Sequence, residues 1–142
     1  ACRIMAARGE ILFHGIAMKP GKPTILCKSG KKPVIGLPGH PGAAFLVSRL
    51  LLPQLLCSIG GRKVRRYPVQ ARLAEPVSAN HGRAQCTAVK LMDNGENVVA
   101  VPARGQSGLI TNLAYSDGFF CIPRDTEGAA AGETVQVYLY DN

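Results

Sequence analysis

The sequence has little that would support stacking on nucleic acid or insertion into a bilayer. None of its 142 residues is tryptophan, and aromatic residues make up only 6%. Proteins that bind single-stranded nucleic acid usually combine basic side chains with aromatic ones, and no run of that kind is present. The longest apolar stretch, Ala43 to Leu52, contains Ser48 and Arg49, stops at Pro53 and is far shorter than the roughly 20 residues that span a membrane. We therefore expect neither a nucleic acid nor a membrane as a partner.

Closely spaced metal ligands are also missing. The cysteines are separated by between 25 residues (Cys2 to Cys27) and 35 residues (Cys86 to Cys121), with no CxxC pair and three histidines in all. Residues 1–7 do not begin with methionine and lack the apolar core of a secretory signal. We expect no metal ligands and a fragment of a cytoplasmic protein with reduced, scattered thiols. These thiols are Cys2, Cys27, Cys57, Cys86 and Cys121.

Acidic residues are almost absent from the first half. Residues 1–66 contain twelve Lys and Arg against Glu10 alone, whereas residues 67–142 contain five against eight acids. The net charges of +11 and −3 predict two modules, residues 1–64 and residues 65–142, with an anionic ligand for the first. The first module also offers no carboxylate pair for acid–base catalysis or for Mg²⁺.

Hydrophobic patterning predicts two different kinds of module. The first contains short strands and then a helix that starts at Pro41 and is kinked or broken at Pro53. Its strands are expected at Glu10–Ile16, Thr24–Lys28 and Pro33–Leu37. After a basic linker, Gly60–Arg66, short segments separated by turn signals predict a small β-barrel or sandwich. These segments are Tyr67–Leu73, Gln85–Leu91, Val98–Val101, Leu109–Leu113, Phe119–Ile122 and Thr134–Tyr140.

The loop KPGKP, which begins at Lys19, is suited to hold an oxyanion. Its prolines fix φ on either side of a glycine, so the loop is stiff and keeps Lys19 and Lys22 in place. Two fixed ammonium groups suit phosphate or a similar oxyanion. The same pattern also fits a proline-rich turn with solvated lysines.

The loop GLPGHP lies between a predicted strand and the predicted helix. The N–H groups and the dipole of a first helical turn favour an anion there, Gly39 permits close approach of backbone to ligand, and Pro41 suits the first turn. His40 would donate to a phosphate, act as acid or base, or simply cap the helix. A strand-to-helix corner that needs glycine only for packing remains an alternative.

Ser107 lies in the segment RGQSG without a neighbouring base or a nucleophile elbow, so we do not expect a serine nucleophile. Together with Arg104 it would contact an anion, or the segment is a plain turn. His14 lies in an apolar strand and is not a candidate.

The motifs HGIAMKPGKPTI and PVIGLPGHP, in this order, resemble the molybdopterin molybdotransferase family, which includes the E domain of gephyrin. SGLITNLAYSDGFFCIP and GETVQVYL resemble the last β domain of that family, so the likeness covers nearly the whole chain. It implies an α/β part followed by an all-β part. The first would be the C-terminal part of a molybdopterin-binding three-layer α/β domain, and the second a small C-terminal β-barrel domain.

The resemblance implies that the full-length protein inserts molybdate into adenylylated molybdopterin and releases AMP, with Mg²⁺ as the metal. Lys19 and Lys22 match the loop lysines of the family and are the candidate catalytic residues, which would stabilise negative charge without exchanging protons. The candidate cofactor-binding residues are Pro38, Gly39, His40, Pro41 and Ser107. By position, Ser107 resembles a serine that the last domain contributes across a homodimer.

The expected partners are adenylylated molybdopterin and molybdate, and the Mg²⁺ ligands are expected upstream of this chain. The family pattern Gly-Asn-Pro-Val-Ser-Ala is here Gly-His-Pro-Gly-Ala-Ala, so His40 replaces an amide and Ala43 lacks a hydroxyl. These departures motivate the alternative of a non-catalytic scaffolding or assembly module with the same fold.

Overall fold

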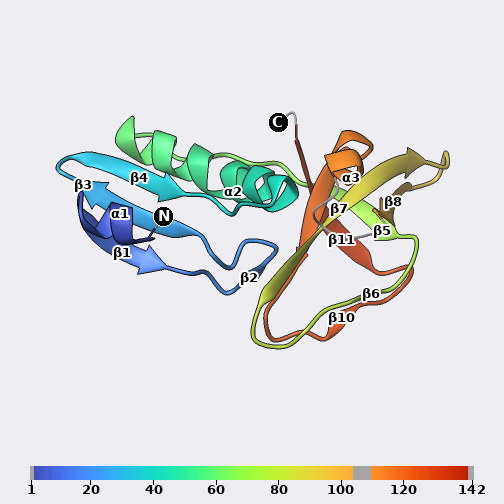
Figure 1. Cartoon of the computed structure of the whole chain (residues 1–142). Helices are drawn as coiled ribbons and strands as arrows, with labels where there is room; N and C mark the ends of the chain where they lie inside the picture. Colours follow the sequence, from blue (N-terminus) through green and yellow to red (C-terminus); the bar gives the residue numbers. More distant parts are fainter. Residues whose placement is uncertain (1, 104–109, 141–142) are drawn as a thin grey trace.

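The computed structural model describes residues 2–103 and 110–140, and Figure 1 shows them as two parts side by side. The N-terminal part is a three-stranded antiparallel sheet of order β1-β3-β4, with the long helix α2 beside it. Its elements are α1 (Cys2–Ala6), β1 (Glu10–His14), β3 (Ile25–Ser29), β4 (Lys32–Gly36) and α2 (Pro41–Ile59). The three predicted strands are confirmed to within a few residues. That they belong to a three-layer domain stays a prediction.

Helix α2 passes through Pro53, so of the two predicted outcomes at that residue, a kink or a break, the break is excluded. A proline inside a helix removes the hydrogen bond to the carbonyl four residues earlier, which here is that of Arg49. The Arg66 guanidinium donates to this Arg49 carbonyl instead. A side chain from the following segment therefore supplies the Arg49 carbonyl with a donor in place of the N–H that Pro53 lacks.

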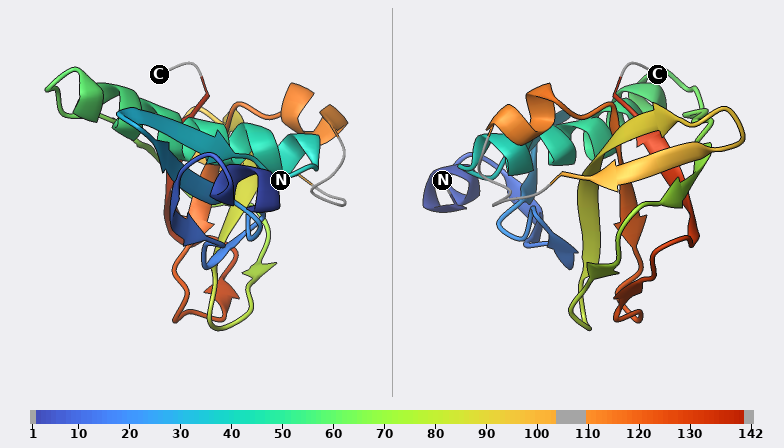
Figure 2. Two further views of the ribbon diagram at one scale, coloured as in Figure 1. Left: turned by 60° about the vertical axis from the view of Figure 1, so that its left-hand side comes forward. Right: turned by 90° about the vertical axis from the view of Figure 1, so that its right-hand side faces the viewer.

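The C-terminal part is a closed barrel. Its sheet has the order β2-β7-β8-β5-β11-β9, and an additional pairing of β7 with β9 joins five strands into a ring. In the right-hand view of Figure 2 the barrel faces the viewer, whereas in the left-hand view the N-terminal part comes forward. The five strands are β5 (Val69–Leu73), β7 (Ala84–Asp93), β8 (Val98–Pro102), β9 (Gly118–Ile122) and β11 (Thr134–Leu139). The predicted barrel is confirmed, and the sandwich alternative is excluded.

Two short pairings accompany the barrel. Strand β2 (Met18–Lys19), from the N-terminal part, runs parallel to β7, while β6 (Val77–Ser78) pairs with β10 (Gly128–Ala129). The closed ring therefore carries one strand from residues before the predicted boundary at 64/65.

Two hydrophobic clusters hold the molecule together. One fills the barrel and includes Leu73, Val89, Phe120 and Val137, all at most 2% exposed. The other joins Leu46 of α2 to barrel residues, and its buried members are Leu46, Cys86, Phe119 and Tyr140. This second cluster fixes α2 against the barrel and thereby positions the loops at the start of the helix.

Of the segment predicted as a strand at Leu109–Leu113, residues 110–113 form part of a helix instead, and Leu109 lies outside the described residues. Helix α3 (Ile110–Ala114) closes with a hydrogen bond from the Ser116 backbone N–H to the Leu113 carbonyl. A short apolar run can form either a helix or a strand, and periodicity does not distinguish them. Leu113 packs against the cluster between α2 and the barrel, so tertiary contacts decide the outcome.

The expectation of five reduced thiols is wrong for two of them. Strands β7 and β9 pair in a register that places Cys86 directly opposite Cys121, and the two form a disulfide. The remaining cysteines, Cys2, Cys27 and Cys57, are free. Residues 35 positions apart carry no pairing signal in a sequence, because the strand register brings them together. The cytoplasmic location stays a prediction, now without support from thiol chemistry.

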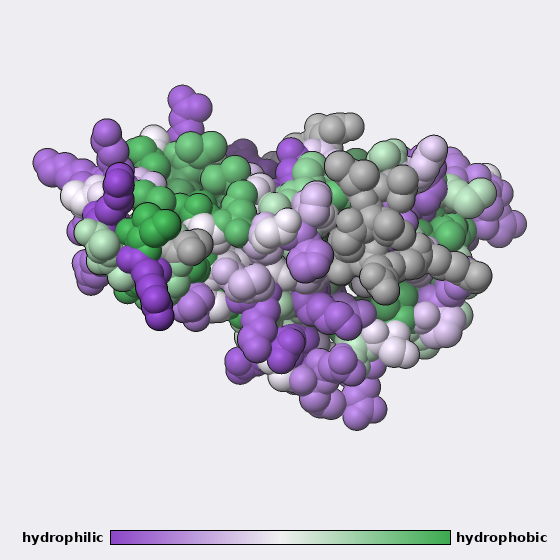
Figure 3. All heavy atoms as spheres, in the orientation of Figure 1, coloured by the Kyte–Doolittle hydropathy of each residue, from purple (hydrophilic) through white to green (hydrophobic). Residues whose placement is uncertain are grey.

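By length and composition alone, α2 could cross a membrane, and it is the one helix in the described ranges that meets this test. It is longer than the apolar run seen in the sequence because it passes Pro53. Only 22% of its most apolar window is buried, and Figure 3 shows apolar surface gathered at the end that holds α2. A helix from the core of a soluble protein passes the same test, so the finding does not establish a membrane span.

Candidate functional site

The KPGKP loop is closed by its own hydrogen bonds. The backbone N–H of Gly15 donates to the Thr24 carbonyl at 2.8 Å, and that of Ile16 donates to the Lys22 carbonyl at 3.0 Å. The fully buried Thr24 hydroxyl donates to the Gly21 carbonyl at 2.6 Å. The stiffness predicted from the prolines is therefore reinforced by a buried hydroxyl that the sequence analysis did not single out.

This loop rests directly on α2. Gly21 has a φ of +131°, and a Cβ built there would lie 2.8 Å from the Val47 Cγ2 and from the Met18 Cε. Val47 lies six residues after Pro41, or about 9 Å along the axis at 1.5 Å per residue. Glycine is thus required where the lysine loop packs against the helix, close to its start.

The start of α2 presents open backbone. His40 is the N-cap residue, in an extended conformation, and its side chain makes no capping hydrogen bond to the part of the chain that the structure describes. Pro38 is buried, whereas Gly39, His40 and Pro41 are exposed. A Cβ at Gly39 would meet no described atom within 4 Å. First-turn N–H groups without an intrahelical partner are suited to an anion.

Lys19 faces the barrel. The parallel pairing of β2 with β7 places Lys19 opposite Gln85. Together they line a pocket of about 160 Å³, and its lining residues are Lys19, Asn80, His81, Arg83 and Gln85. Lys22 and the GLPGHP loop do not line it, so the two candidate lysines are not brought into one pocket.

The sequence analysis missed Asn80, His81 and Arg83. They lie in or beside one of the turns between the predicted strands of the second half, and the negative net charge of that half gave no reason to expect an anion site there. The parallel pairing of a two-residue strand with a distant one leaves no periodicity to detect. The one available signal was three polar or basic residues within four positions.

Hydrogen bonds fix the turn that carries these residues. The Gly82 N–H donates to the Arg124 carbonyl at 2.8 Å, and the Gln85 side-chain amide donates to the Ser78 carbonyl at 2.8 Å. His81 Nε2 lies 3.4 Å from a Glu127 carboxylate oxygen. The pocket wall formed by the barrel is therefore anchored to neighbouring strands and loops.

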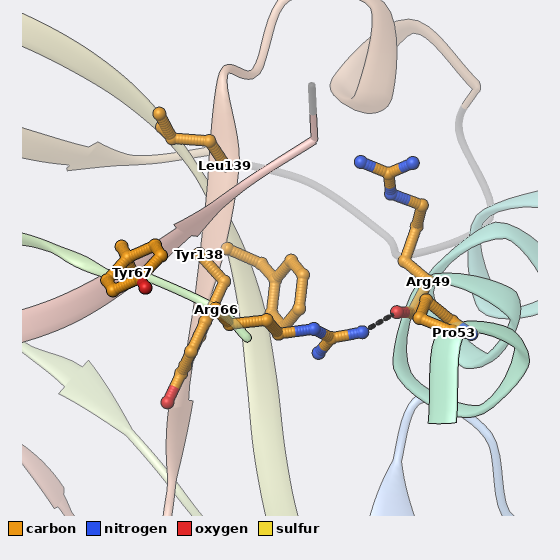
Figure 4. A pocket seen from close by; sticks show the side chains of 7 residues that line it. Arg49, Pro53, Arg66, Tyr67, Tyr138 and Leu139 are labelled. Atoms are coloured by element: carbon orange, nitrogen blue, oxygen red, sulfur yellow. Dashed lines mark hydrogen bonds between the residues drawn. The ribbon is translucent and has the colours of Figure 1, made fainter. Parts of the chain in front are cut away.

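A second hollow lies between α2, the segment after it and the barrel (Figure 4). Figure 4 shows the Arg66 side chain reaching to α2, where it donates to the Arg49 carbonyl, while the Arg49 guanidinium points elsewhere. The volume of about 50 Å³ is less than twice the roughly 30 Å³ that one water molecule occupies in the liquid. We regard this hollow as a structural junction and not as a ligand site.

Tyr140 packs beside this junction. Burial raises the pKa of Tyr140 to about 12, and the nearby Arg49 charge partly opposes that rise. Its buried hydroxyl has no hydrogen-bond partner among residues 2–103 and 110–140. Its ring packs edge-on against Phe45 at a centroid distance of 5.0 Å.

Ser107, a candidate cofactor-binding residue, lies outside the described residues. Within the described ranges, no three His, Cys, Asp or Glu side chains gather in a way that could hold a metal ion. Those residues therefore do not fit Mg²⁺, and its expected ligands upstream of this chain stay a prediction.

Comparison with known sequences gives a consistent picture. Residues 70–140 match the model of the MoeA C-terminal region (domain IV). A protein of Methanocaldococcus jannaschii named for molybdopterin biosynthesis is 31% identical over 132 residues, which are 92% of this chain and 30% of that protein. A molybdopterin molybdenumtransferase of Staphylococcus aureus is 26% identical over 139 residues, or 96% of this chain and 33% of the relative. The chain thus spans about a third of the length of these relatives.

Solved structures agree. The crystal structure of a molybdopterin biosynthesis MoeA protein from Pyrococcus horikoshii superposes with a TM-score of 0.86 at 37% identity, covering 99% of this chain and 34% of that one. A molybdenum cofactor biosynthesis protein from Pyrococcus furiosus superposes with a TM-score of 0.81 at 30% identity, covering 93% of this chain and 46% of that one. The likeness therefore extends over both parts of the fold.

Proposed function

The chain belongs to the MoeA family, and from this premise we propose that it is the C-terminal part of an enzyme that inserts molybdate into adenylylated molybdopterin and releases AMP. The observation that carries the proposal is the seating of the KPGKP loop on α2, near a helix start that no described side chain caps. Both substrates are anions, and these are the elements that can hold one.

In this proposal the two lysines act through charge. A hydrogen bond to a charged group contributes about 1.5–3 kcal/mol, so Lys19 and Lys22 would each contribute about that much to binding the anionic group that it contacts. Neither lysine needs to transfer a proton. The stiff loop lowers the cost of holding them in place, because few rotations are lost when the ligand arrives.

The start of α2 would supply neutral donors for the same charge. Gly39 leaves space that a side chain would fill, and Pro38 and Pro41 fix the backbone on either side of it. His40 stands at the N-cap, where its ring could donate to a ligand without being needed to cap the helix.

Mg²⁺ takes oxygen ligands, chiefly carboxylates, and the residues described here gather no such set. No step is therefore assigned to the metal in this chain. The family relation also supports a homodimer to which Ser107 contributes across the interface, and a cytoplasmic location.

The proposal is tested with a chimera. This chain replaces the matched C-terminal third of the M. jannaschii relative, and the chimera is expressed in cells that lack molybdotransferase. We expect the chimera to restore molybdenum cofactor formation, measured as the activity of a molybdenum enzyme in those cells. In the double variant Lys19→Ala/Lys22→Ala this enzyme activity should fall at least about tenfold, because the loss of one charge-assisted hydrogen bond has an effect of that size.

The matched control is Lys28→Ala/Lys31→Ala, which removes two exposed cations from the same part of the chain. Retained activity in the Lys19/Lys22 variant would refute the assignment of these residues. A soluble chimera that fails, where the M. jannaschii parent succeeds, would favour the scaffolding alternative motivated by His40 and Ala43.

Gly39→Ala gives a second readout. Because a Cβ there meets no described atom, the substitution should leave the melting temperature unchanged while lowering cofactor formation. Gly21→Ala should instead lower both, since its Cβ would collide with Val47 and its φ is unfavourable for alanine.

A further inference from the structure

We infer that the Cys86–Cys121 pair is a site of reversible thiol–disulfide exchange with a dithiol reductant, and that its redox state sets how firmly β2 is held against the barrel. The inference deepens the proposed function by giving it a form of regulation, and it rests on that function only for what Lys19 does. In the cytoplasm, the location proposed above, disulfides are rare and are mostly transient or redox-sensing.

The two cysteines differ in exposure. Cys86 is only 6% exposed, whereas Cys121 is half-buried. The rate of thiol–disulfide exchange depends on which sulfur the incoming thiolate can reach. The geometry therefore assigns the attack to Cys121 and makes Cys86 the leaving group.

Reduction proceeds through two balanced exchanges. One thiolate of the reductant attacks the Cys121 sulfur, the bond between the two cysteines breaks, and the Cys86 sulfur leaves as a thiolate that takes up a proton. The second thiol of the reductant, once deprotonated, attacks its own partner sulfur in the mixed disulfide and releases the Cys121 thiolate, which is protonated in turn. The protein gains two electrons and two protons, and the reductant becomes a disulfide. The reverse sequence, with such a disulfide as oxidant, restores the bond.

The barrel does not need this bond to stay closed. Strands β7 and β9 pair over five positions, from Gln85 opposite Ile122 to Val89 opposite Gly118. This backbone pairing remains when the sulfurs separate. The exchange is therefore reversible without unfolding of the ring.

The bond lies next to the residues that hold β2. Cys86 directly follows Gln85, which pairs with Lys19 of β2. The Ala84 N–H donates to the Ala17 carbonyl at 2.9 Å. The part of β7 that carries β2 is therefore the part that the disulfide fastens to β9.

The sulfurs also belong to a packed cluster. Cys86 is a buried member of the cluster between α2 and the barrel, and both Cys121 and Met18 of β2 pack against it. Two sulfurs without a bond cannot lie as close together as bonded ones, and added volume in a well-packed interior forces its neighbours to move. Reduction therefore disturbs the packing of Met18 and of Leu46 on α2, and it loosens the strand that carries Lys19.

Amide hydrogen exchange of the 142-residue chain, followed residue by residue by NMR, tests this coupling. The oxidised chain is compared with the chain in excess dithiothreitol, a small dithiol. The Ala84 N–H, which joins β7 to β2, should accelerate about fivefold more in the reductant than the Leu73 N–H does. Leu73 is the internal control, because it belongs to the other cluster and donates to the Glu133 carbonyl.

The matched control is Cys86→Ala/Cys121→Ala, which has no bond to reduce, so dithiothreitol should leave its exchange rates unchanged. Cys86→Ser/Cys121→Ser replaces it if its circular dichroism differs from that of the parent. Equal acceleration of the Ala84 and Leu73 amides in the parent would reveal a purely structural cross-link and overturn the inference. A response of the control variant to the reductant would also overturn it.

Thiol counts test the exchange itself. The folded chain should show five thiols in dithiothreitol and return to three after transfer to oxidised dithiothreitol. A thioredoxin whose second active-site cysteine is replaced by serine should be trapped as a mixed disulfide on Cys121, identified by peptide mass spectrometry. A bond that resists reduction until the chain unfolds, or a mixed disulfide on Cys86, would contradict the site.

These measurements do not depend on cofactor formation. If the Ala84 amide responds to reductant in a chimera that makes no cofactor, the exchange site stands and the proposed enzyme activity fails. If the chimera makes cofactor and this amide does not respond, the activity stands and the exchange site fails.

Discussion

Tyr140 combines a well-packed aromatic ring with a buried hydroxyl group that makes no hydrogen bond to the described residues. Its ring is buried between Phe45 and Phe119, while its hydroxyl has no partner in the described residues. A buried, unsatisfied hydroxyl costs about 1–3 kcal/mol, and the aromatic contacts do not require it. The ring therefore stabilises the junction of α2 and the barrel, whereas the hydroxyl lowers the stability of the folded protein.

Tyr140→Phe should accordingly be neutral or raise the free energy of unfolding by about 1 kcal/mol, measured by urea denaturation at pH 7. The pKa of Tyr140 rises from 10.0 to about 12 in the folded protein, so its neutral form stabilises the fold fully below pH 10. That contribution is lost as the pH rises through 12. Parent stability should fall over this range more steeply than that of Tyr140→Phe, and equal slopes would contradict the burial of the hydroxyl.

The pKa of Asp117 is lowered in the folded protein, whereas that of Tyr140 is raised. Its carboxylate accepts a hydrogen bond from the Leu91 backbone N–H at 2.7 Å and another from Lys90 Nζ at 3.0 Å. The Leu91 bond is the largest influence that lowers the pKa of Asp117 below its ordinary value of 3.8, and burial opposes it. The carboxylate thus ties the loop before β9 to β7.

Because the folded pKa is depressed, this stabilisation is present above pH 3.8 and disappears as the pH falls through the folded value. Asp117→Asn should lower stability at pH 7 by no more than about 1 kcal/mol, since the partly exposed pair is screened by water. Thermal melts of parent and variant should converge in acid. A gap that persists in acid, after the carboxylate has become protonated, would show that the variant acts through something other than charge.

At the scale of elements, α2 shows how a helix tolerates an internal proline. The carbonyl of Arg49, left without its helical donor by Pro53, accepts a hydrogen bond from Arg66 (Figure 4). The same bond fastens the segment after the helix to the helix itself. Sequence patterning placed Arg66 in a basic linker and assigned it no contact.

A double-mutant cycle tests this pairing. Arg66→Ala should lower the free energy of unfolding by about 1–3 kcal/mol, because it leaves a carbonyl without a donor. In a Pro53→Ala background the residue 53 N–H is restored, and the same substitution should then have a much smaller effect. Urea denaturation of the four proteins measures the coupling, and strictly additive effects would show that Arg66 does not replace the missing donor.

The disulfide is also a property of paired elements. Cys86 on β7 and Cys121 on β9 meet where the two strands that close the barrel are paired. A bond that closes a loop of this length contributes about 2–4 kcal/mol. Cys86→Ala/Cys121→Ala should therefore lower stability by that amount.

Two measurements check the disulfide. Titration of the denatured, unreduced protein with a thiol reagent should find three thiols per chain, belonging to Cys2, Cys27 and Cys57. Cys57→Ala serves as the control and should alter the melting temperature less, because it breaks no cross-link. Five titrating thiols would contradict the bond.

At the scale of the whole molecule, one face of α2 exposes large apolar side chains to solvent. Leu52, Leu56 and Ile59 are exposed large hydrophobic residues, the last two at 65% and 64%. Continuous apolar patches of this kind promote association.

The isolated 142-residue chain should therefore self-associate at micromolar concentration. Leu56→Lys/Ile59→Lys should shift it towards the monomer, as measured by light scattering after size-exclusion chromatography. Tyr115→Ser alters another exposed large side chain, which follows α3 and is not part of the α2 face, and should leave association unchanged. If the parent chain is a monomer, the exposed α2 face does not drive association and the prediction is wrong.

The sequence by itself determined the short strands, the start of α2, the barrel and the family, because local periodicity, turn residues and contiguous motifs carry that information. It also identified KPGKP and GLPGHP as anion-binding candidates. Only the tertiary structure decided that Lys19 faces Arg83 while Lys22 does not, that Cys86 meets Cys121, and that α2 continues through Pro53. Each of these depends on strand register or on a side chain distant in sequence, and neither leaves a local pattern in the chain.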